Sequence, residues 1–405
     1  PVTERYRPEP RFPDLGEGFA DPVPPAQFPG ARLRFRNRRW AARVGLGALT
    51  VDEWLSHFAR FEPLPGNLER PLALRYHGHQ FQAYNPQLGD GRGFLFAQMR
   101  DADDGRLLDL GTKGSGTTPY SRGGDGRLTL KGGVREALAT EMLEALGVYT
   151  SKSFSLVETG EKLWRQDEPS PTRASVLVRL SHSHVRFGTF QRHAYHKDAE
   201  RLRALVDYCA AHFYPALRDE RPEWRPVALL REVARRSAEL AASWMAAGFV
   251  HGVLNTDNMN VTGESFDYGP YRFLPTFDPT FVAAYFDHGG LYAFGRQPRI
   301  VLWNLERLGD ALTPLAPAAD LSGALEDYPG LFEEAFRRRF LARFGVRARD
   351  LARDGALVSA AYAFLAESQI GYERFFFDWF GGAASEPRAM AGAEKARYAG
   401  KRFEA

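Results

Sequence analysis

The chain has 405 residues, of which 44% are hydrophobic and 25% charged, a balance typical of a globular protein with a large core. The formal net charge is only +3, so nothing in the composition calls for a nucleic-acid or anionic-membrane partner. No stretch approaches the roughly 20 apolar residues that cross a bilayer. The single cysteine, Cys209, excludes an internal disulfide framework and favours a reducing compartment, by default the cytoplasm.

The first half of the chain predicts strands separated by turns. Residues 1–30 are rich in proline and are expected to form an extended arm rather than a core element. Strands are predicted at 93–100 and 106–114, and the turn between them makes the pair a hairpin. A loop rich in Gly, Ser and Thr follows at 114–127.

A helix is predicted over 130–147, where four apolar residues recur at helical spacing and Gly147 ends the run. The four are Val134, Leu138, Met142 and Leu146. Two further strands are expected, at 153–158 and 174–181.

Beyond residue 186 the pattern becomes helical. Long helices are predicted at 202–217 and 229–249, followed by a loop-rich insert at 249–290, and segment 381–400 is expected to be poorly ordered. Strands first and helices afterwards predict an α+β protein of two lobes. The expected division is a strand-rich lobe at 1–185 and a larger helical lobe at 186–405.

Two motifs in the first lobe are of a kind that binds phosphate. In LGDGRG at 88–93, Gly89 and Gly91 permit close approach of backbone N–H groups to a phosphate, and Arg92 adds charge. A simple Gly-Asp-Gly turn explains the same letters. Lys113 ends a strand, and Glu136 lies on the next helix, the arrangement by which kinase-like folds hold ATP phosphates. A surface lysine and an unrelated acid remain the alternative.

The segments HGVLNTDNMN and DYG contain the acidic chemistry of the second lobe. Asn258 and Asp267 offer the hard oxygen ligands that suit Mg²⁺, with Mn²⁺ as an alternative, and Asp257 is left to accept a hydroxyl proton. An Asx-rich loop that bonds its own backbone is the alternative. The loop lacks the His-Arg-Asp of protein kinases, and its Asp and Asn are adjacent, so ordinary phosphoryl-transfer geometry is not assumed.

With these motifs in place, the chain resembles the selenoprotein O family of pseudokinase-like protein adenylyltransferases. The resemblance covers roughly residues 76–308 and is carried by long, specific motifs. They include YHGHQFQAYNPQLGDGR, KGSGTTPYSRGGDGR, VRLSHSHVRFGTF and GFVHGVLNTDNMN.

The resemblance implies a protein-kinase-like fold that binds ATP in the reverse orientation and transfers AMP to Ser, Thr or Tyr hydroxyls of proteins, the enzyme itself included. Pyrophosphate would be released. By matching position, Lys113 holds phosphate and pairs with Glu136, Arg179 and Arg186 bind the phosphate tail, Asp257 is the base, and Asn258 and Asp267 hold Mg²⁺. The nucleotide site would be lined by Gly89, Gly91, Arg92, Asp125 and Gly126, with Asp267 also facing the nucleotide.

The residues themselves support the reversed nucleotide. Arg179 and Arg186 follow the last strand of the first lobe, where a kinase places its apolar adenine pocket, and guanidinium groups suit phosphates better than a purine. Two solvated arginines at a lobe junction are the alternative. Two rival functions also stay open, a conventional kinase of a protein or small molecule and a nucleotide-binding pseudokinase scaffold without turnover.

Other residues are predicted to be structural. The pairs His77/His79 and His182/His184 are expected to hydrogen-bond rather than to bind zinc, because a zinc site needs three or four convergent ligands. Cys209 lies in an apolar helical pattern and is expected in the core.

Overall fold

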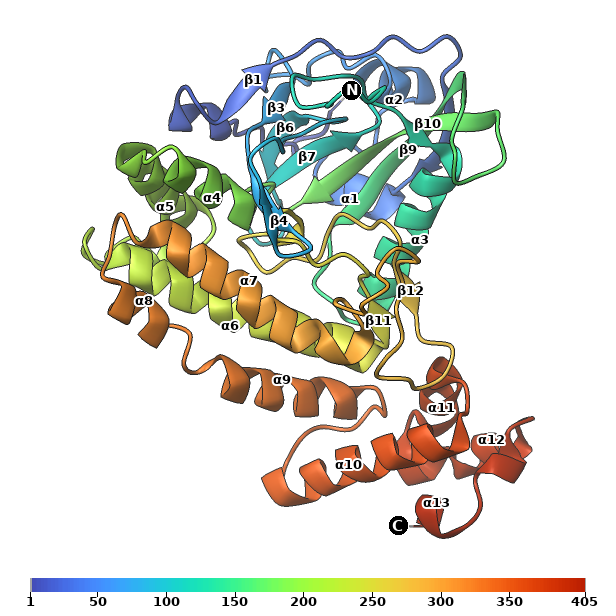
Figure 1. Ribbon diagram of the computed structural model, residues 1–405. Helices are drawn as coiled ribbons and strands as arrows, with labels where there is room; N and C mark the ends of the chain where they lie inside the picture. The colour runs from blue at the N-terminus through green and yellow to red at the C-terminus, as the bar shows by residue number, and fades with distance from the viewer. Residues whose placement is uncertain (1, 405) are drawn as a thin grey trace.

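The computed structural model of the protein describes residues 2–404 and shows a mixed α+β fold. An antiparallel sheet occupies the N-terminal part, and helices occupy the C-terminal part (Figure 1). The strands are β1 (Ala20–Pro22), β2 (Arg32–Arg36), β3 (Leu72–Leu74), β4 (Gly78–Gln80), β5 (Ala83–Asn85), β6 (Leu95–Arg100), β7 (Leu107–Lys113), β8 (Leu128–Thr129), β9 (Lys152–Leu163), β10 (Thr172–Ser181), β11 (Phe249–Val250) and β12 (Arg272–Phe273).

Most helices follow β10 in the chain. The α-helices are α1 (Arg38–Arg43), α2 (Val51–Phe58), α3 (Leu130–Ala145), α4 (Phe187–Tyr195), α5 (Ala199–His212), α6 (Arg225–Ala247), α7 (Gln297–Leu312), α8 (Ala318–Gly323), α9 (Tyr328–Ala342), α10 (Leu351–Ser368), α11 (Tyr372–Trp379), α12 (Glu386–Ala391) and α13 (Lys401–Glu404). Short 3₁₀ helices are η1 (Phe12–Leu15), η2 (Pro215–Leu217), η3 (Thr256–Asn258), η4 (Phe294–Arg296), η5 (Gly382–Ser385) and η6 (Lys395–Arg397).

The large sheet has the strand order β1-β3-β6-β7-β10-β9-β2, and β8 pairs with β10. The predicted hairpin is present as β6 and β7, which pair antiparallel. All seven residues of β7 are buried, because both faces of the central strands are covered. On one face Trp54 and Phe58 of α2 pack against Phe154 of β9.

Helix α3 forms as predicted, but it buries a different face. Val134 and Leu138 are 41% and 62% exposed, whereas Glu136 is fully buried. The helix is turned so that Glu136 meets a cation on β7, and an unpaired buried carboxylate would cost more than two exposed apolar side chains. Apolar spacing therefore predicted the helix but does not mark its buried face.

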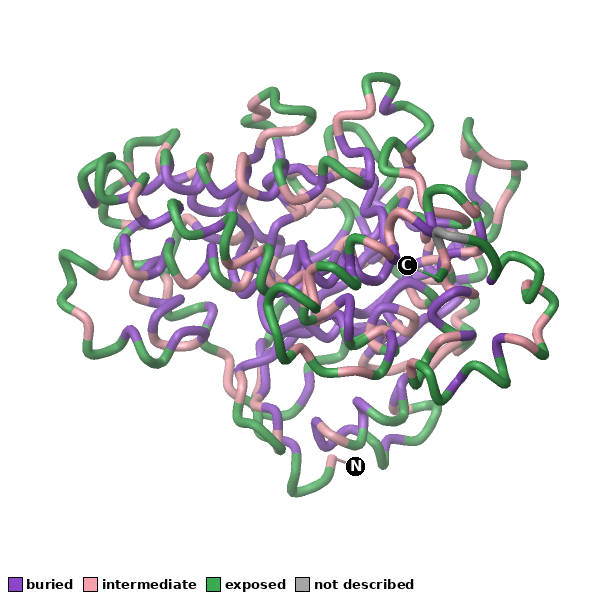
Figure 2. Tube along the Cα trace, turned by 90° about the horizontal axis from the view of Figure 1, so that it is seen from below, coloured by how far each residue is buried: buried purple, intermediate pink, exposed green. Residues whose placement is uncertain are grey.

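The helical region has its own core around α6, whose 23 residues include 15 buried ones and which ends at Gly248 in a left-handed conformation. Helices α4, α5 and α7 contact α6 or one another (Figure 1). Seen from below, buried backbone runs through the centre of the molecule and exposed segments lie at peripheral loops (Figure 2). No helix within residues 2–404 is long and apolar enough to cross a membrane.

Two sequence expectations about the ends of the chain are wrong. The proline-rich arm contributes β1 to the sheet, and Phe12 and Phe19 enter the core of the helical region. Aromatic residues between the prolines anchor the arm despite its extended backbone. Segment 381–400 forms short helices, because Ala389 and Tyr398 are buried among the aromatic residues of α10 and α11.

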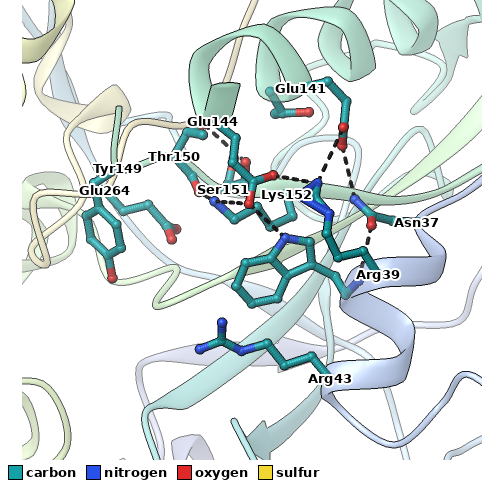
Figure 3. A network of polar contacts seen from close by, with 12 residues as sticks. Asn37, Arg39, Arg43, Glu141, Glu144, Tyr149, Thr150, Ser151, Lys152 and Glu264 are labelled. Carbon is teal, nitrogen blue, oxygen red and sulfur yellow. Dashed lines mark hydrogen bonds and ion pairs between the residues drawn. The ribbon is translucent and has the colours of Figure 1, made fainter. Parts of the chain in front are cut away.

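A polar network joins α1, α3 and the start of β9 (Figure 3), and the segment before β9 also bonds the loop that precedes Asp267. The Lys152 Nζ atom donates to the carbonyl of Thr150 at 2.7 Å and lies 3.6 Å from the Glu144 carboxylate of α3. The Ser151 and Ser265 segments exchange backbone hydrogen bonds, Ser151 N to Ser265 O and Ser265 N to Tyr149 O, each at 2.9 Å. The position of the loop before Asp267 is thus set by the start of β9.

Candidate active site

A cavity of about 600 Å³ contains most of the predicted site residues. Those on its wall are Gly89, Gly91, Arg92, Lys113, Asp125, Gly126, Arg179, Arg186, Asp257 and Asp267. The wall carries seven Lys or Arg side chains and four Asp side chains, so seven minus four leaves a formal surplus of three positive charges. A cavity of this charge suits a polyanion such as a nucleoside triphosphate.

Lys113 of the sheet bonds two acidic side chains, Glu136 and Asp267. Its Nζ atom donates to Glu136 Oε2 at 2.7 Å and to Asp267 Oδ1 at 3.2 Å. Lys113 ends β7, and Glu136 stands on α3, so strand and helix meet at this ion pair. Glu136 itself lies behind the lysine rather than on the cavity wall.

Two buried arginines, Arg179 and Arg186, converge on Asp267 from the other side. Arg179 Nη1 lies 3.1 Å from Asp267 Oδ1 and 3.4 Å from Glu136 Oε1. Arg186 Nη1 donates to Asp267 Oδ2 and to the backbone carbonyl of Asp257, both at 2.9 Å. Both arginines are at most 4% exposed, so the alternative of solvated junction arginines does not describe them.

Aromatic rings hold the guanidinium of Arg186 in place. It lies 4.4 Å from the ring centroid of Tyr76 and 4.8 Å from that of Phe266. Stacking between rings fixes the plane of a guanidinium and leaves its edge free to donate.

Asp267 is the common partner of the three cations. Burial alone would raise the pKa of its carboxyl, but Lys113, Arg179 and Arg186 hold that pKa well below its ordinary value. The residue therefore stays ionised at neutral pH. Its backbone is left-handed, with φ of 67°, an uncommon conformation for a residue other than glycine.

Asp257 has the opposite electrostatic setting. Burial raises the pKa of its carboxyl to about 7, although Arg186 opposes the shift. Its Oδ1 atom is buried and has no hydrogen-bond partner within the described part of the chain. The residue is 8% exposed and belongs to the cavity wall. A poised carboxylate with a free oxygen is what a general base requires.

Asn258 lies beside Asp257 in η3 but not on the cavity wall. Its Nδ2 atom donates to the carbonyl of Val253 at 2.8 Å, which leaves the amide oxygen as the atom offered to a cation. No group of three or more His, Cys, Asp or Glu residues within 2–404 is arranged to hold a metal. A Mg²⁺ site with two protein ligands and further oxygens from phosphates and water is compatible with these donors.

Glycines at the outer part of the cavity are required by close packing. A Cβ atom at Gly89 would lie 2.4 Å from the ring of Tyr120, and one at Gly126 would lie 2.2 Å from the carbonyl of Gly116. Gly126 also has a positive φ of 68°. Asp125 next to it is held by Arg165, with contacts of 2.8 and 3.1 Å.

Sequence reasoning missed Asp90, which stands between two predicted glycines. Asp90 Oδ2 accepts from Leu74 N at 3.1 Å, and Oδ1 lies 3.5 Å from Arg186 Nη2. Burial raises the pKa of its carboxyl, and Arg186 lowers it. The carboxylate positions both the glycine loop and Arg186. The need of a buried arginine for a second counter-charge was the only sequence signal that could have found it.

The histidines and the cysteine have the structural settings that were expected. His77 Nδ1 lies 2.7 Å from the Tyr84 hydroxyl, and His182 Nδ1 contacts the Tyr149 hydroxyl. His184 binds Asp109, with Nδ1 at 3.2 Å from Oδ2. Cys209 is fully buried, and burial raises the pKa of its thiol.

Comparison with known proteins shows which family the chain belongs to. A family model described as protein adenylyltransferase SelO matches residues 3–389. The protein nucleotidyltransferase YdiU of Synechocystis sp. is 51% identical over 377 residues, which cover 91% of this chain and 78% of that protein. The protein of the same name from Gloeobacter violaceus is 51% identical over 398 residues, with 96% and 81% covered. That of Vibrio cholerae is 40% identical over 366 residues, with 90% and 73% covered. The chain belongs to the SelO family of protein adenylyltransferases.

Proposed function

We propose that this protein transfers AMP from ATP to Ser, Thr or Tyr hydroxyls of proteins, on a protein-kinase-like two-lobe fold that binds ATP in the reverse of the kinase orientation. The family supports the adenylyl transfer. The observation that supports the orientation is the pair of buried arginines, Arg179 and Arg186, which reach Asp267 beside Lys113.

The reversed orientation follows from what the inner end of the cavity can stabilise. The three cations Lys113, Arg179 and Arg186 have only two carboxylates, Glu136 and Asp267, as partners. The triphosphate tail of ATP would supply further negative charge there. A purine offers no charge and would leave these donors poorly satisfied. The tail therefore belongs inside, and the α-phosphate lies nearer Asp257.

In the transfer itself, Asp257, which lies on the cavity wall, accepts the proton of the acceptor hydroxyl on its carboxylate. The hydroxyl oxygen forms a bond to the α-phosphorus, and the bond from that phosphorus to the bridging oxygen of pyrophosphate breaks. Lys113, Arg179 and Arg186 hold the departing pyrophosphate. Asn258 and Asp267 would hold Mg²⁺, which when bound neutralises phosphate charge.

Labelled ATP distinguishes this reaction from its two rivals. The protein is incubated with Mg²⁺ and ATP labelled at either the α- or the γ-phosphate, and protein-bound label is followed on the enzyme and on a lysate. We expect label from the α-position only. Label from the γ-position only would make the protein a kinase. ATP binding without either label would favour a scaffold.

A further inference from the structure

Three exposed aromatic side chains gather next to the loop that carries Asp257. Phe81, Tyr285 and Phe286 are 39%, 79% and 42% exposed, although large apolar side chains are usually buried. The rings of Phe81 and Phe286 are 6.0 Å apart, and those of Tyr285 and Phe286 are 5.1 Å apart. We call these three residues the aromatic patch.

The aromatic patch is tied to the loop that carries Asp257. The Tyr292 hydroxyl donates to Asn255 Oδ1 at 2.7 Å, and Asn255 precedes Asp257 by two residues. The backbone N–H of Phe81 points at both groups, 3.1 Å from Asn255 Oδ1 and 3.0 Å from the Tyr292 oxygen. Three segments far apart in sequence thus meet at one hydrogen-bonded junction.

The β4–β5 hairpin connects the patch to the cavity. Gln80, the neighbour of Phe81, lies on the cavity wall. At the other end of β4, Gly78 packs so closely on Asp257 that a Cβ atom there would lie 3.0 Å from Asp257 Oδ1. The hairpin therefore runs from the proposed base to the exposed rings.

The loop that presents Tyr285 and Phe286 is braced from within. Asp287 is buried, and its two carboxylate oxygens accept from Leu291 N at 2.9 Å and Tyr292 N at 2.8 Å. Its own N–H donates to the carbonyl of Ala284 at 3.0 Å. Because the loop is already fixed, little conformational entropy is lost when a partner binds to its rings.

We propose that the aromatic patch docks the acceptor protein and selects segments that carry an apolar or aromatic side chain near the modified hydroxyl. This inference rests on the proposed function. An acceptor hydroxyl that reaches Asp257 brings its own chain across the cavity mouth, and the patch is the apolar surface joined to that mouth by Gln80 and Phe81. Rigid exposed aromatic rings are the side chains that most often anchor a protein partner.

The apolar side chain that binds the aromatic patch is expected to lie close in sequence to the modified hydroxyl of the acceptor. An extended peptide advances about 3.3 Å per residue, so a ring that starts one residue from the cavity wall serves an anchor within about three residues of the hydroxyl. The surplus positive charge lies inside the cavity, where the proposed function places ATP. Apolar contact rather than charge is therefore expected to set the preference.

The test uses the full chain with Mg²⁺-ATP and short peptides that contain one Ser, Thr or Tyr hydroxyl. Each peptide is made with a Phe one to three residues from the hydroxyl and, as its pair, with a Ser in place of that Phe. We expect a KM about tenfold lower for the Phe peptide and an unchanged kcat, as burial of one aromatic ring implies. The Tyr285→Ser/Phe286→Ser variant should lose this difference while its affinity for ATP stays unchanged.

The matched control is the Phe377→Ser/Phe380→Ser variant, which removes two aromatic side chains of 60% and 57% exposure at the end of α11. It should keep the peptide preference. Equal KM values for both peptides in the unaltered protein would overturn the docking inference while leaving AMP transfer intact. Absence of AMP transfer to any acceptor would instead refute the proposed function. A changed sedimentation coefficient in the Tyr285→Ser/Phe286→Ser variant would assign the patch to contact between copies of this chain and also overturn the inference.

Discussion

At the scale of single residues, the site depends on three cations that share two carboxylates, the buried Glu136 and the half-buried Asp267. Lys113 and Arg179 each contact both Glu136 and Asp267, and Arg186 contacts Asp267. Each charge has an oppositely charged neighbour within 3.4 Å. Removing one member therefore leaves an uncompensated buried charge, which is costly in a low-dielectric setting.

For Lys113→Ala we expect the kcat/KM of AMP transfer to fall about 100-fold or more, because a phosphate contact is lost and Glu136 keeps only the 3.4 Å contact with Arg179. Label transfer from α-labelled ATP measures this. Lys131→Ala removes an exposed lysine at the start of α3, the helix that carries Glu136, and serves as the control. Full activity of Lys113→Ala would remove the lysine from the mechanism.

Asp257 makes the reaction depend on pH. Since its pKa in the free protein is about 7 and the base must be ionised, kcat/KM should rise about tenfold per pH unit below 7 and level off above it. A flat profile between pH 5 and 8 would contradict the assignment of Asp257 as the base.

The raised pKa of Asp257 also makes the stability of the folded protein depend on pH. Between the unfolded value near 3.8 and about 7, the folded protein keeps a proton that the unfolded chain releases, so the free energy of unfolding falls as pH rises through this window. Asp257→Asn removes this loss. The variant should be more stable than the unaltered protein at pH 8, on the order of a few kcal/mol, and the difference should shrink toward pH 4, as urea unfolding would measure.

At the scale of elements, the β4–β5 hairpin positions the base. A Cβ atom at position 78 would press against Asp257 Oδ1 at 3.0 Å and the Leu88 side chain at 3.2 Å, so one of them would have to shift. His77 is held to α4 by a 3.0 Å backbone hydrogen bond to Gly188. The hairpin is thus fixed on both sides, and its residues transmit small shifts to Asp257.

Gly78→Ala should push Asp257 out of place and lower kcat about tenfold or more while ATP affinity is kept. Gly269→Ala is the matched control, because nothing lies within 4 Å of a Cβ atom there although the glycine belongs to the Asp-Tyr-Gly motif. Comparable kcat losses in both variants would argue against a positioning role of the hairpin.

At the scale of the whole molecule, the C-terminal helices form a separate aromatic core that packs on the end of α6. Phe376 is 2% exposed and lies 5.2 Å from Phe340 and 5.0 Å from Phe344, between ring centroids. The Tyr372 hydroxyl donates to the carbonyls of Met245 and Ala246 at 3.1 and 3.2 Å. This core supports α6, which leads into the loop that carries Asp257.

Phe376→Ala should lower the free energy of unfolding by about 3–5 kcal/mol, the usual cost of removing a buried ring. Its neighbour Phe377 is 60% exposed, so Phe377→Ala should cost about 1 kcal/mol or less. Denaturant unfolding of the two variants measures the contrast. Equal losses would mean that the aromatic core is not the source of this stability.

The sequence by itself determined the elements and the chemistry of this protein. Periodicity gave the β6–β7 hairpin and the helices α3 and α6, because hydrophobic spacing is a local property. Motifs gave the phosphate-binding and acidic residues, because only certain side chains suit phosphates and Mg²⁺. Ten of those residues lie on one cavity wall, and their catalytic roles stay predictions.

Only the tertiary structure decided which groups meet. The buried face of α3 is set by Glu136 reaching Lys113, and the role of Asp90 is set by Arg186. The poised pKa of Asp257 and the exposed patch of Phe81, Tyr285 and Phe286 likewise arise from segments distant in the chain. The physical reason is that burial and Coulomb interactions depend on separation in space, which local sequence patterns do not contain.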